Sequence, residues 1–352
     1  MTGLHDSVKD YYGKELTTSD DLKTNACCTE ADMPAHIKAA LANVHDEVMI
    51  KYYGCGLTIP NQVQGLSVVD LGSGSGRDVY VAAQLVGEHG SVTGIDMTDE
   101  QLAVANEHIE YHREKFGYEE SNVNFIKGNI DHLGELGLES GSVDLIISNC
   151  VINLVEDKAK VLRDAYDLLK PGGEMYFSDV YSDRRIPADL QKDAVLWGEC
   201  LSGALYWNDF LRTAQAAGFT DPRAMASNVI TIQNEELEAR VGDIKFYSVT
   251  YRLWKIDGLE PDCEDYGQAV AYRGTVAHAP TSFSLDDHHI FPKGKVMPVC
   301  GNTYKMLFDT RYKDHFDFYG TWDTHYGIFE GCGGAMPFGA EASAGSDPAS
   351  CC

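Results

Sequence analysis

The sequence predicts an α/β fold built on a doubly wound parallel sheet, followed by a smaller α+β domain. Strand-like and helix-like segments alternate from residue 66 to about residue 220, which is typical of βαβ units. A glycine-rich turn connects the first strand-like run to a helical pattern, as in doubly wound sheets that bind nucleotides. After about residue 228 the chain becomes richer in loops and aromatic residues. We therefore divide it into 1–60 (helical, thiol-bearing), 61–225 (sheet domain), 226–334 (second domain) and 335–352 (disordered tail).

The glycine-rich turn carries the main cofactor signal. An apolar run ends in Asp70, and three glycines follow at alternating positions: Gly72, Gly74 and Gly76. Glycine permits the tight backbone turn that precedes the helix expected over 78–86. The next apolar run, 91–95, ends in Asp96, where the second strand of such a sheet presents an acid to ribose hydroxyls. We assign the neighbouring Met97 to the same site.

The glycine spacing distinguishes between two classes of cofactor. In the dinucleotide fingerprint a third glycine falls three places after the second, and this chain has Arg77 there. Gly-x-Gly-x-Gly behind an acid resembles the class I, Rossmann-like S-adenosylmethionine methyltransferases more than the NAD enzymes. The resemblance implies that Asn129 and Ile130, just past the third strand, flank the adenine, although a turn asparagine is the alternative.

The remaining elements of the sheet domain follow in order. We expect a helix over 98–115, strands over 123–126 and 143–148, a helix over 158–169, a turn at 171–173 and a strand over 174–178. Before the sheet, Pro34 opens a helix to about Tyr53, since apolar residues recur at helical spacing. Tyr52 and Tyr53 are either packing residues or one of them covers the cofactor, because an aromatic face attracts a sulfonium as it does an ammonium. We assign Tyr53 to that role. In the second domain, alternation predicts a strand over 246–251.

Composition limits the classes of function. The chain has 352 residues and a formal net charge of −26, which argues against a nucleic-acid or anionic-membrane partner because phosphate binding needs clustered Lys and Arg. No apolar run is long enough to cross a bilayer. The ten cysteines are scattered rather than arranged as a secreted disulfide framework. We expect a cytoplasmic monomer with free or ligand-binding thiols.

Two cysteines stand where substrate should lie. Cys150 follows the fourth strand, and Cys200 lies in a segment that can fold over the same end of the sheet. Taken singly, each is readily explained as a packed thiol. A four-cysteine zinc site is a further alternative, but the chain lacks the closely spaced Cys-x-x-Cys pairs of such sites. Soft thiolates suit a thiophilic centre that is held and then methylated.

Long motifs now identify the family that the chain resembles. Asp-Leu-Gly-Ser-Gly-Ser-Gly-Arg-Asp, Ser-Asn-Cys-Val-Ile-Asn-Leu and Leu-Trp-Gly-Glu-Cys-Leu-Ser-Gly-Ala-Leu-Tyr together resemble the arsenite S-adenosylmethionine methyltransferases. The resemblance implies that Cys150 and Cys200 hold trivalent arsenic and that Cys27 and Cys55 supply further thiol chemistry, with Cys55 as an additional arsenic ligand. It also implies arsenite or its glutathione conjugate as substrate, mono- and dimethylated products in detoxification, and glutathione or thioredoxin as reductant.

Two other interpretations stay open at this point. The chain is alternatively a small-molecule methyltransferase with incidental thiols, or a metalloid- or zinc-binding protein without activity. The sequence leaves Cys263, Cys300 and Cys332 as structural or surface thiols. The tail pair Cys351 and Cys352 either captures arsenic or is incidental.

Overall fold

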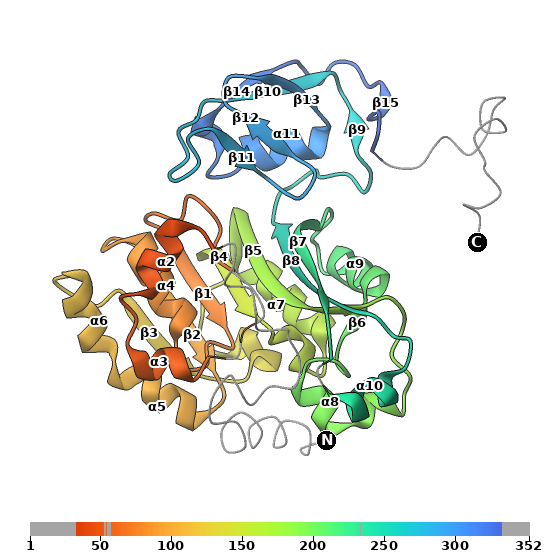
Figure 1. Ribbon diagram of the computed structural model, residues 1–352. Helices are drawn as coiled ribbons and strands as arrows, with labels where there is room; N and C mark the ends of the chain where they lie inside the picture. Colours follow the sequence, from red (N-terminus) through yellow and green to blue (C-terminus); the bar gives the residue numbers. More distant parts are fainter. Residues whose placement is uncertain (1–32, 53, 55–57, 233, 333–352) are drawn as a thin grey trace.

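A computed structural model describes residues 33–52, 54, 58–232 and 234–332. An eight-stranded sheet forms its centre, and a smaller second unit lies beyond one end of that sheet (Figure 1). The strands of the main sheet are β1 (Ser67–Leu71), β2 (Ser91–Asp96), β3 (Val123–Lys127), β4 (Val143–Asn149), β5 (Leu169–Ser182), β6 (Leu205–Tyr206), β7 (Arg223–Ile230) and β8 (Phe246–Trp254). Within the described residues, no helix is long and apolar enough to cross a membrane.

The sheet has the order β3-β2-β1-β4-β5-β8-β7, and β6 pairs with β5. The first five strands are parallel, as the sequence predicts, whereas β8 runs antiparallel to both β5 and β7. The predicted parallel sheet is therefore confirmed for β1 to β5, which form one part of a mixed sheet. The strand predicted over 246–251 is confirmed within β8, but it lies in the main sheet. The boundary proposed at residue 225 falls inside β7.

Helices cover both faces of the sheet. The helices of the first two-thirds of the chain are α2 (Ala35–Leu41), α3 (Asp46–Ile50), α4 (Arg77–Val86), α5 (Asp99–Glu107), α6 (Ile109–Phe116), α7 (Lys158–Leu168), α8 (Ala194–Gly198), α9 (Trp207–Ala216) and α10 (Glu235–Val241). One apolar core joins α7 and α9 to β4, β5 and β8. The other joins α2, α3 and α4 to the opposite face of the sheet. Burial on both faces explains why the central strands read as continuous apolar runs.

Three predicted elements differ from the structure in detail. The helix expected from Pro34 is two short helices, α2 and α3, and the helix expected over 98–115 divides at His108, whose backbone leaves helical geometry (φ −99°, ψ 8°). The turn expected at 171–173 lies inside β5, where the pairing with β4 shifts register. Such an irregularity accommodates Pro171 and two glycines without ending the strand.

The second unit packs a helix against small antiparallel sheets. It contains β9 (Glu264–Asp265), β10 (Gln268–Tyr272), β11 (Ser282–Ser284), β12 (Ile290–Pro292), β13 (Val296–Val299), α11 (Gly301–Phe308), β14 (Phe316–Tyr319) and β15 (Gly327–Ile328). An aromatic-rich core, which includes Tyr272, Phe283 and Phe316, holds these elements together. The α+β character expected for this part of the chain agrees with these elements.

Buried ion pairs connect the two units. Arg252 of β8 and Arg311 both bind the buried carboxylate of Glu174, at 2.5 Å each. Arg223, at the start of β7, pairs with Asp286 at 3.2 Å, and Asp286 also contacts the His289 ring at 2.8 Å. Burial opposes ionisation of Asp286, but His289 and Arg223 hold its pKa at about 2.

Replacing Asp286 with Asn should lower the free energy of unfolding by about 2 kcal/mol at pH 7, because a carboxylate with a depressed pKa favours the folded state. This contribution is complete above the ordinary pKa of 3.8 and is lost as the pH falls through about 2. Urea titrations of the full chain at pH 7, 4 and 3 measure it. The neighbouring Asp287→Asn is the matched control. Equal losses in both variants, or a loss at Asp286 that does not shrink in acid, would contradict the assignment.

Candidate active site

A pocket opens at the carboxyl ends of the parallel strands, where doubly wound sheets bind ligands. Its empty volume, including the open mouth, is about 950 Å³, which is the size range of small-molecule sites. Seven of the predicted cofactor residues line it: Asp70, Gly72, Gly74, Asp96, Met97, Asn129 and Ile130. The Asn129 side chain also accepts the Asp131 backbone N–H at 3.0 Å, so the structure shows the turn role that was proposed as its alternative.

The glycine turn is shaped for close approach. Gly72 has φ +73°, and a β-carbon there would lie 2.4 Å from the Val151 side chain. The Asp96 carboxylate accepts the backbone N–H groups of Gly74 at 2.9 Å and Thr98 at 2.8 Å. Asp96 therefore fixes the turn in addition to facing the pocket. Gly76 begins α4 with φ +90° and is not among the pocket-lining residues, so its glycine serves the backbone turn.

Carboxylates give the pocket its electrostatic character. Burial, together with the charges of Asp78 and Asp96, raises the pKa of Asp70 well above its usual value. Burial also raises the pKa of Asp96, although backbone hydrogen bonds oppose that shift. Among the described residues, the buried Ser73 hydroxyl on the pocket wall has no hydrogen-bond partner. A ligand with positive charge and several hydroxyl groups would satisfy both the carboxylates and this hydroxyl.

An aromatic residue covers one side of the pocket. Tyr52 lines it, the Arg77 guanidinium lies 3.0 Å from the centre of the Tyr52 ring, and the Asn149 amide donates to the Tyr52 hydroxyl at 2.5 Å. The residue assigned from sequence, Tyr53, lies outside the described residues, as do Cys27 and Cys55. Among the described residues, Tyr52 is therefore the tyrosine that lies beside the pocket.

Cys150 and Cys200 come together at the end of the sheet. Their sulfur atoms and an Asp179 carboxylate oxygen all lie within 4.8 Å of one another. Cys150 also lines the pocket, which Cys200 does not. Both are buried in an apolar cluster with residues of α8, α10 and β8. The fold thus brings together two cysteines that are fifty positions apart in the sequence.

The backbone at both cysteines is strained. Cys150 has φ +57° and Cys200 has φ +60°, values that side chains with a β-carbon rarely adopt. Such strain persists only where surrounding contacts impose it, and it concentrates at functional sites. The Cys200 thiol donates to the Cys150 carbonyl oxygen at 3.4 Å. The strain therefore accompanies an arrangement that aims two sulfur atoms at one place.

Asp179 and Lys158 belong to this site although the sequence analysis did not select them. Burial raises the pKa of Asp179 to about 7, despite hydrogen bonds from the backbone N–H groups of Val180 and Asn153. Burial lowers the pKa of Lys158, whose charge faces Asp179, Asp131 and Cys200. Asp179 directly follows the strand predicted over 174–178, and that predicted strand end was the available signal, although β5 itself continues to Ser182.

Cys150 is disulfide-bonded in this structure. A disulfide sulfur has no thiolate to offer a soft ligand. Reduction must therefore precede any ligand binding by Cys150.

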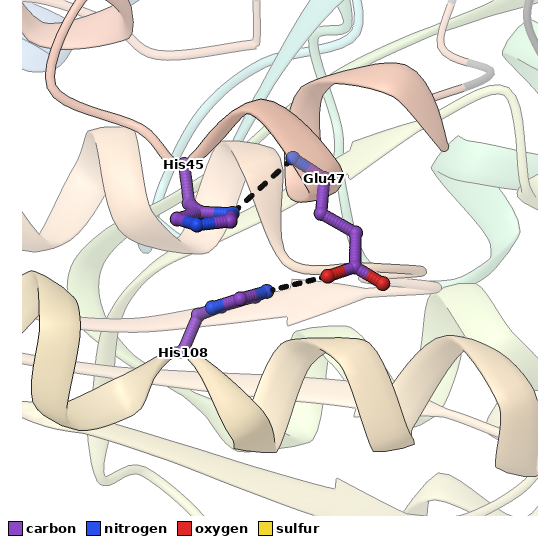
Figure 2. Close-up of side chains that lie close together, drawn as sticks. All are labelled: His45, Glu47 and His108. Atoms are coloured by element: carbon purple, nitrogen blue, oxygen red, sulfur yellow. Dashed lines mark hydrogen bonds and ion pairs between the residues drawn. The ribbon is translucent and has the colours of Figure 1, made fainter.

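A second group of potential ligand side chains supports the pocket indirectly. His45 at the start of α3 stacks on His108 at 3.8 Å between ring centres, and Glu47 contacts the His108 ring at 3.1 Å (Figure 2). The His45 ring accepts the Glu47 backbone N–H at 3.2 Å. Parallel rings direct their nitrogen lone pairs side by side rather than toward one ion. These contacts fix α3, whose end brings Lys51 and Tyr52 to the pocket.

The chain is similar to known proteins over most of its length. Residues 62–218 match the model of a methyltransferase domain, and residues 260–324 match a domain of unknown function. An arsenite methyltransferase from Aquipseudomonas alcaligenes is 57% identical over 349 residues, which cover 99% of this chain and 100% of that protein. The human arsenite methyltransferase is 48% identical over 324 residues, 90% of this chain and 85% of that protein.

A solved structure is similar over the fold as well. The crystal structure of an arsenic(III) S-adenosylmethionine methyltransferase from Chlamydomonas reinhardtii has 53% sequence identity and a TM-score of 0.82. The match covers 85% of this chain and all of that one. The similarity therefore includes the second unit and is not confined to the nucleotide-binding sheet.

Proposed function

Because the chain belongs to the arsenite methyltransferase family, we propose that Cys150 and Cys200 hold trivalent arsenic at the mouth of the S-adenosylmethionine pocket. The protein is an S-adenosylmethionine-dependent transferase with a class I methyltransferase fold, and it methylates arsenite in keeping with a detoxifying role. The observation that carries the proposed site is the meeting of two buried sulfur atoms at a strand end, where Cys150 lines the cofactor pocket.

The pocket residues fit this cofactor. S-adenosylmethionine, when bound, supplies an electrophilic methyl group on a positively charged sulfur. Asp96 would accept from the ribose hydroxyls, and Asn129 and Ile130 would flank the adenine. The buried carboxylates of Asp70 and Asp78 would offset the positive charge of the ligand, which is consistent with the raised pKa of Asp70 in their present surroundings.

The thiol pair would capture and orient the substrate. Two arsenic–sulfur bonds form as two arsenic–oxygen bonds of arsenous acid break, and the two hydroxyl groups leave as water with the thiol protons. Arsenic keeps its lone pair and its trivalent state in this step. Chelation by two fixed sulfurs directs that lone pair, and such positioning can lower a barrier by roughly 7 to 11 kcal/mol at best.

A thiol reductant completes the proposed cycle. Methylation formally oxidises arsenic from the trivalent to the pentavalent state, so two electrons must return before a second methyl group is added. The disulfide at Cys150 supports the need for a reductant, and we propose glutathione or thioredoxin for that role. By resemblance, Cys27 and Cys55 would pass these electrons on, with Cys55 as a further arsenic ligand. Mono- and dimethylated arsenicals are the proposed products.

Mass-spectrometric detection of methylated arsenic tests the function. The full chain with arsenite, S-adenosylmethionine and glutathione should yield mono- and dimethylated arsenic. Omitting the thiol should limit the yield to about one turnover or less, because a disulfide-bonded Cys150 offers no thiolate. Cofactor binding without any methylated product would reject arsenite as the substrate. Undiminished multiple turnover without thiol would reject only the reductant.

A further inference from the structure

Two cysteines of the second unit meet near Arg223, the first residue of β7 in the main sheet. Cys300 begins α11, and Cys263 directly precedes β9. The two thiols are hydrogen-bonded to each other. Neither thiol belongs to a disulfide.

Cys300 is held in one orientation. Its sulfur accepts the Thr303 backbone N–H at 3.4 Å, and the Thr303 hydroxyl lies 3.3 Å away. The Arg223 guanidinium lies 4.0 Å from the same sulfur. The hydrogen bond from Cys263, followed by those from Thr303 and the charge of Arg223, lowers the pKa of Cys300 despite its burial. Donors and positive charge of this kind favour the thiolate.

Cys263 gives solvent access to the pair. It is half-buried, whereas Cys300 is 1% exposed. The hydrogen bond to Cys300 and burial raise the pKa of Cys263, so its thiol is the proton donor of the pair. A ligand would reach Cys263 first and then Cys300.

We propose that Cys263 and Cys300 form a second dithiol site that binds trivalent arsenicals, separate from the methyl-transfer site. Two arsenic–sulfur bonds form there, two arsenic–oxygen bonds break, and the oxygens leave as water with the thiol protons. Arsenic stays trivalent, so no oxidant or reductant is needed. Such a site would hold arsenic on the protein while the methyl-transfer site is occupied.

The surroundings favour this ligand over two others. A divalent metal would bring positive charge beside Arg223, whereas arsenous acid is neutral. In a disulfide the two sulfur atoms must approach to about 2.05 Å. Its formation also removes the negative charge of the thiolate that Thr303 and Arg223 stabilise. A bridging arsenic atom joins two sulfurs while they stay apart. The sulfur of Cys300 can then keep its contacts with Thr303.

Protection from alkylation tests the site in the full chain. Reduced protein is incubated with phenylarsine oxide without oxygen, then treated with N-ethylmaleimide, and the peptide carrying Cys263 is quantified by mass spectrometry. We expect the alkylated fraction of Cys263 to fall by about tenfold, because two thiols bind one arsenic far better than one. Addition of 2,3-dimercaptopropanol should restore alkylation.

Two variants make the test specific. Cys300→Ser should abolish the protection of Cys263 and keep the fold, because Ser is a favoured N-cap residue; unchanged arsenite methylation verifies that the variant is folded. Cys332→Ser is the matched control and should retain protection. Protection that survives in Cys300→Ser, or disappears in Cys332→Ser, would overturn the pairing. The proposal would also be overturned if Cys263 resisted alkylation without the arsenical and the mass of the protein were lower by two hydrogens, because this result indicates a disulfide.

Discussion

Replacing either Cys150 or Cys200 with serine should reduce arsenite methylation by about a thousandfold or more and leave cofactor binding intact. Serine keeps the shape of the side chain but removes the soft ligand, so arsenic would be held by one sulfur and its lone pair would not be aimed. A thousandfold loss corresponds to about 4 kcal/mol of transition-state stabilisation, well within what orientation can supply. Methylated arsenic is measured by mass spectrometry and cofactor affinity by calorimetry.

Cys332→Ser controls for the loss of any thiol, since Cys332 lies outside the pocket. It should methylate arsenite at the wild-type rate. If Cys150→Ser keeps its turnover, the cysteines are incidental and a small-molecule methyltransferase explains the site better. If either variant also fails to bind the cofactor, the residue supports the pocket and its role as arsenic ligand is not established by the lost activity.

Replacing Gly72 with alanine should weaken cofactor binding by about a hundredfold. At φ +73° a side chain with a β-carbon is strained by roughly 1 to 2 kcal/mol, and this β-carbon would also lie 2.4 Å from Val151. Val151 directly follows Cys150, so the displacement reaches the thiol site too. Calorimetric titration with S-adenosylmethionine measures the affinity.

A matched control separates backbone strain from the collision. Gly137 has nearly the same φ, +78°, but a β-carbon there would meet no atom within 4 Å, and the residue lies away from the pocket. Gly137→Ala should lose about the same 1 to 2 kcal/mol of stability and none of the cofactor affinity. Equal affinities in the two variants would show that the glycine turn does not shape the pocket as described.

The parts of the site that depend on local sequence could be predicted. Asp70 and Asp96 end apolar runs and glycines follow the first of them, so strand-end geometry alone places them together. Cys150 was found in the same way, as a thiol at a strand end. Cys200 was selected because its segment can fold over the same end of the sheet, and the family resemblance then implied that it binds arsenic together with Cys150.

The remaining features depend on long-range packing. The left-handed backbone at Cys150 and Cys200 could not be predicted from the sequence, because cysteine has no special preference for that conformation. The pKa of Asp179 is raised by burial that only the folded chain creates. Likewise, β8 alternates as an ordinary strand does, and nothing local shows that it inserts antiparallel between β5 and β7.

The apolar cluster around the sulfur atoms of Cys150 and Cys200 has a consequence for selectivity against common oxyanions. Leu196, Leu201 and Phe246 pack around the thiols, and Asp179 is buried beside them, so a solute that reaches the sulfurs loses much of its hydration. Arsenous acid carries no charge at neutral pH and loses little, whereas phosphate and arsenate are anions whose desolvation costs several kcal/mol, which the Lys158 charge facing Cys200 would offset only in part. We therefore expect the proposed site to discriminate between valence states of arsenic before any bond to sulfur forms.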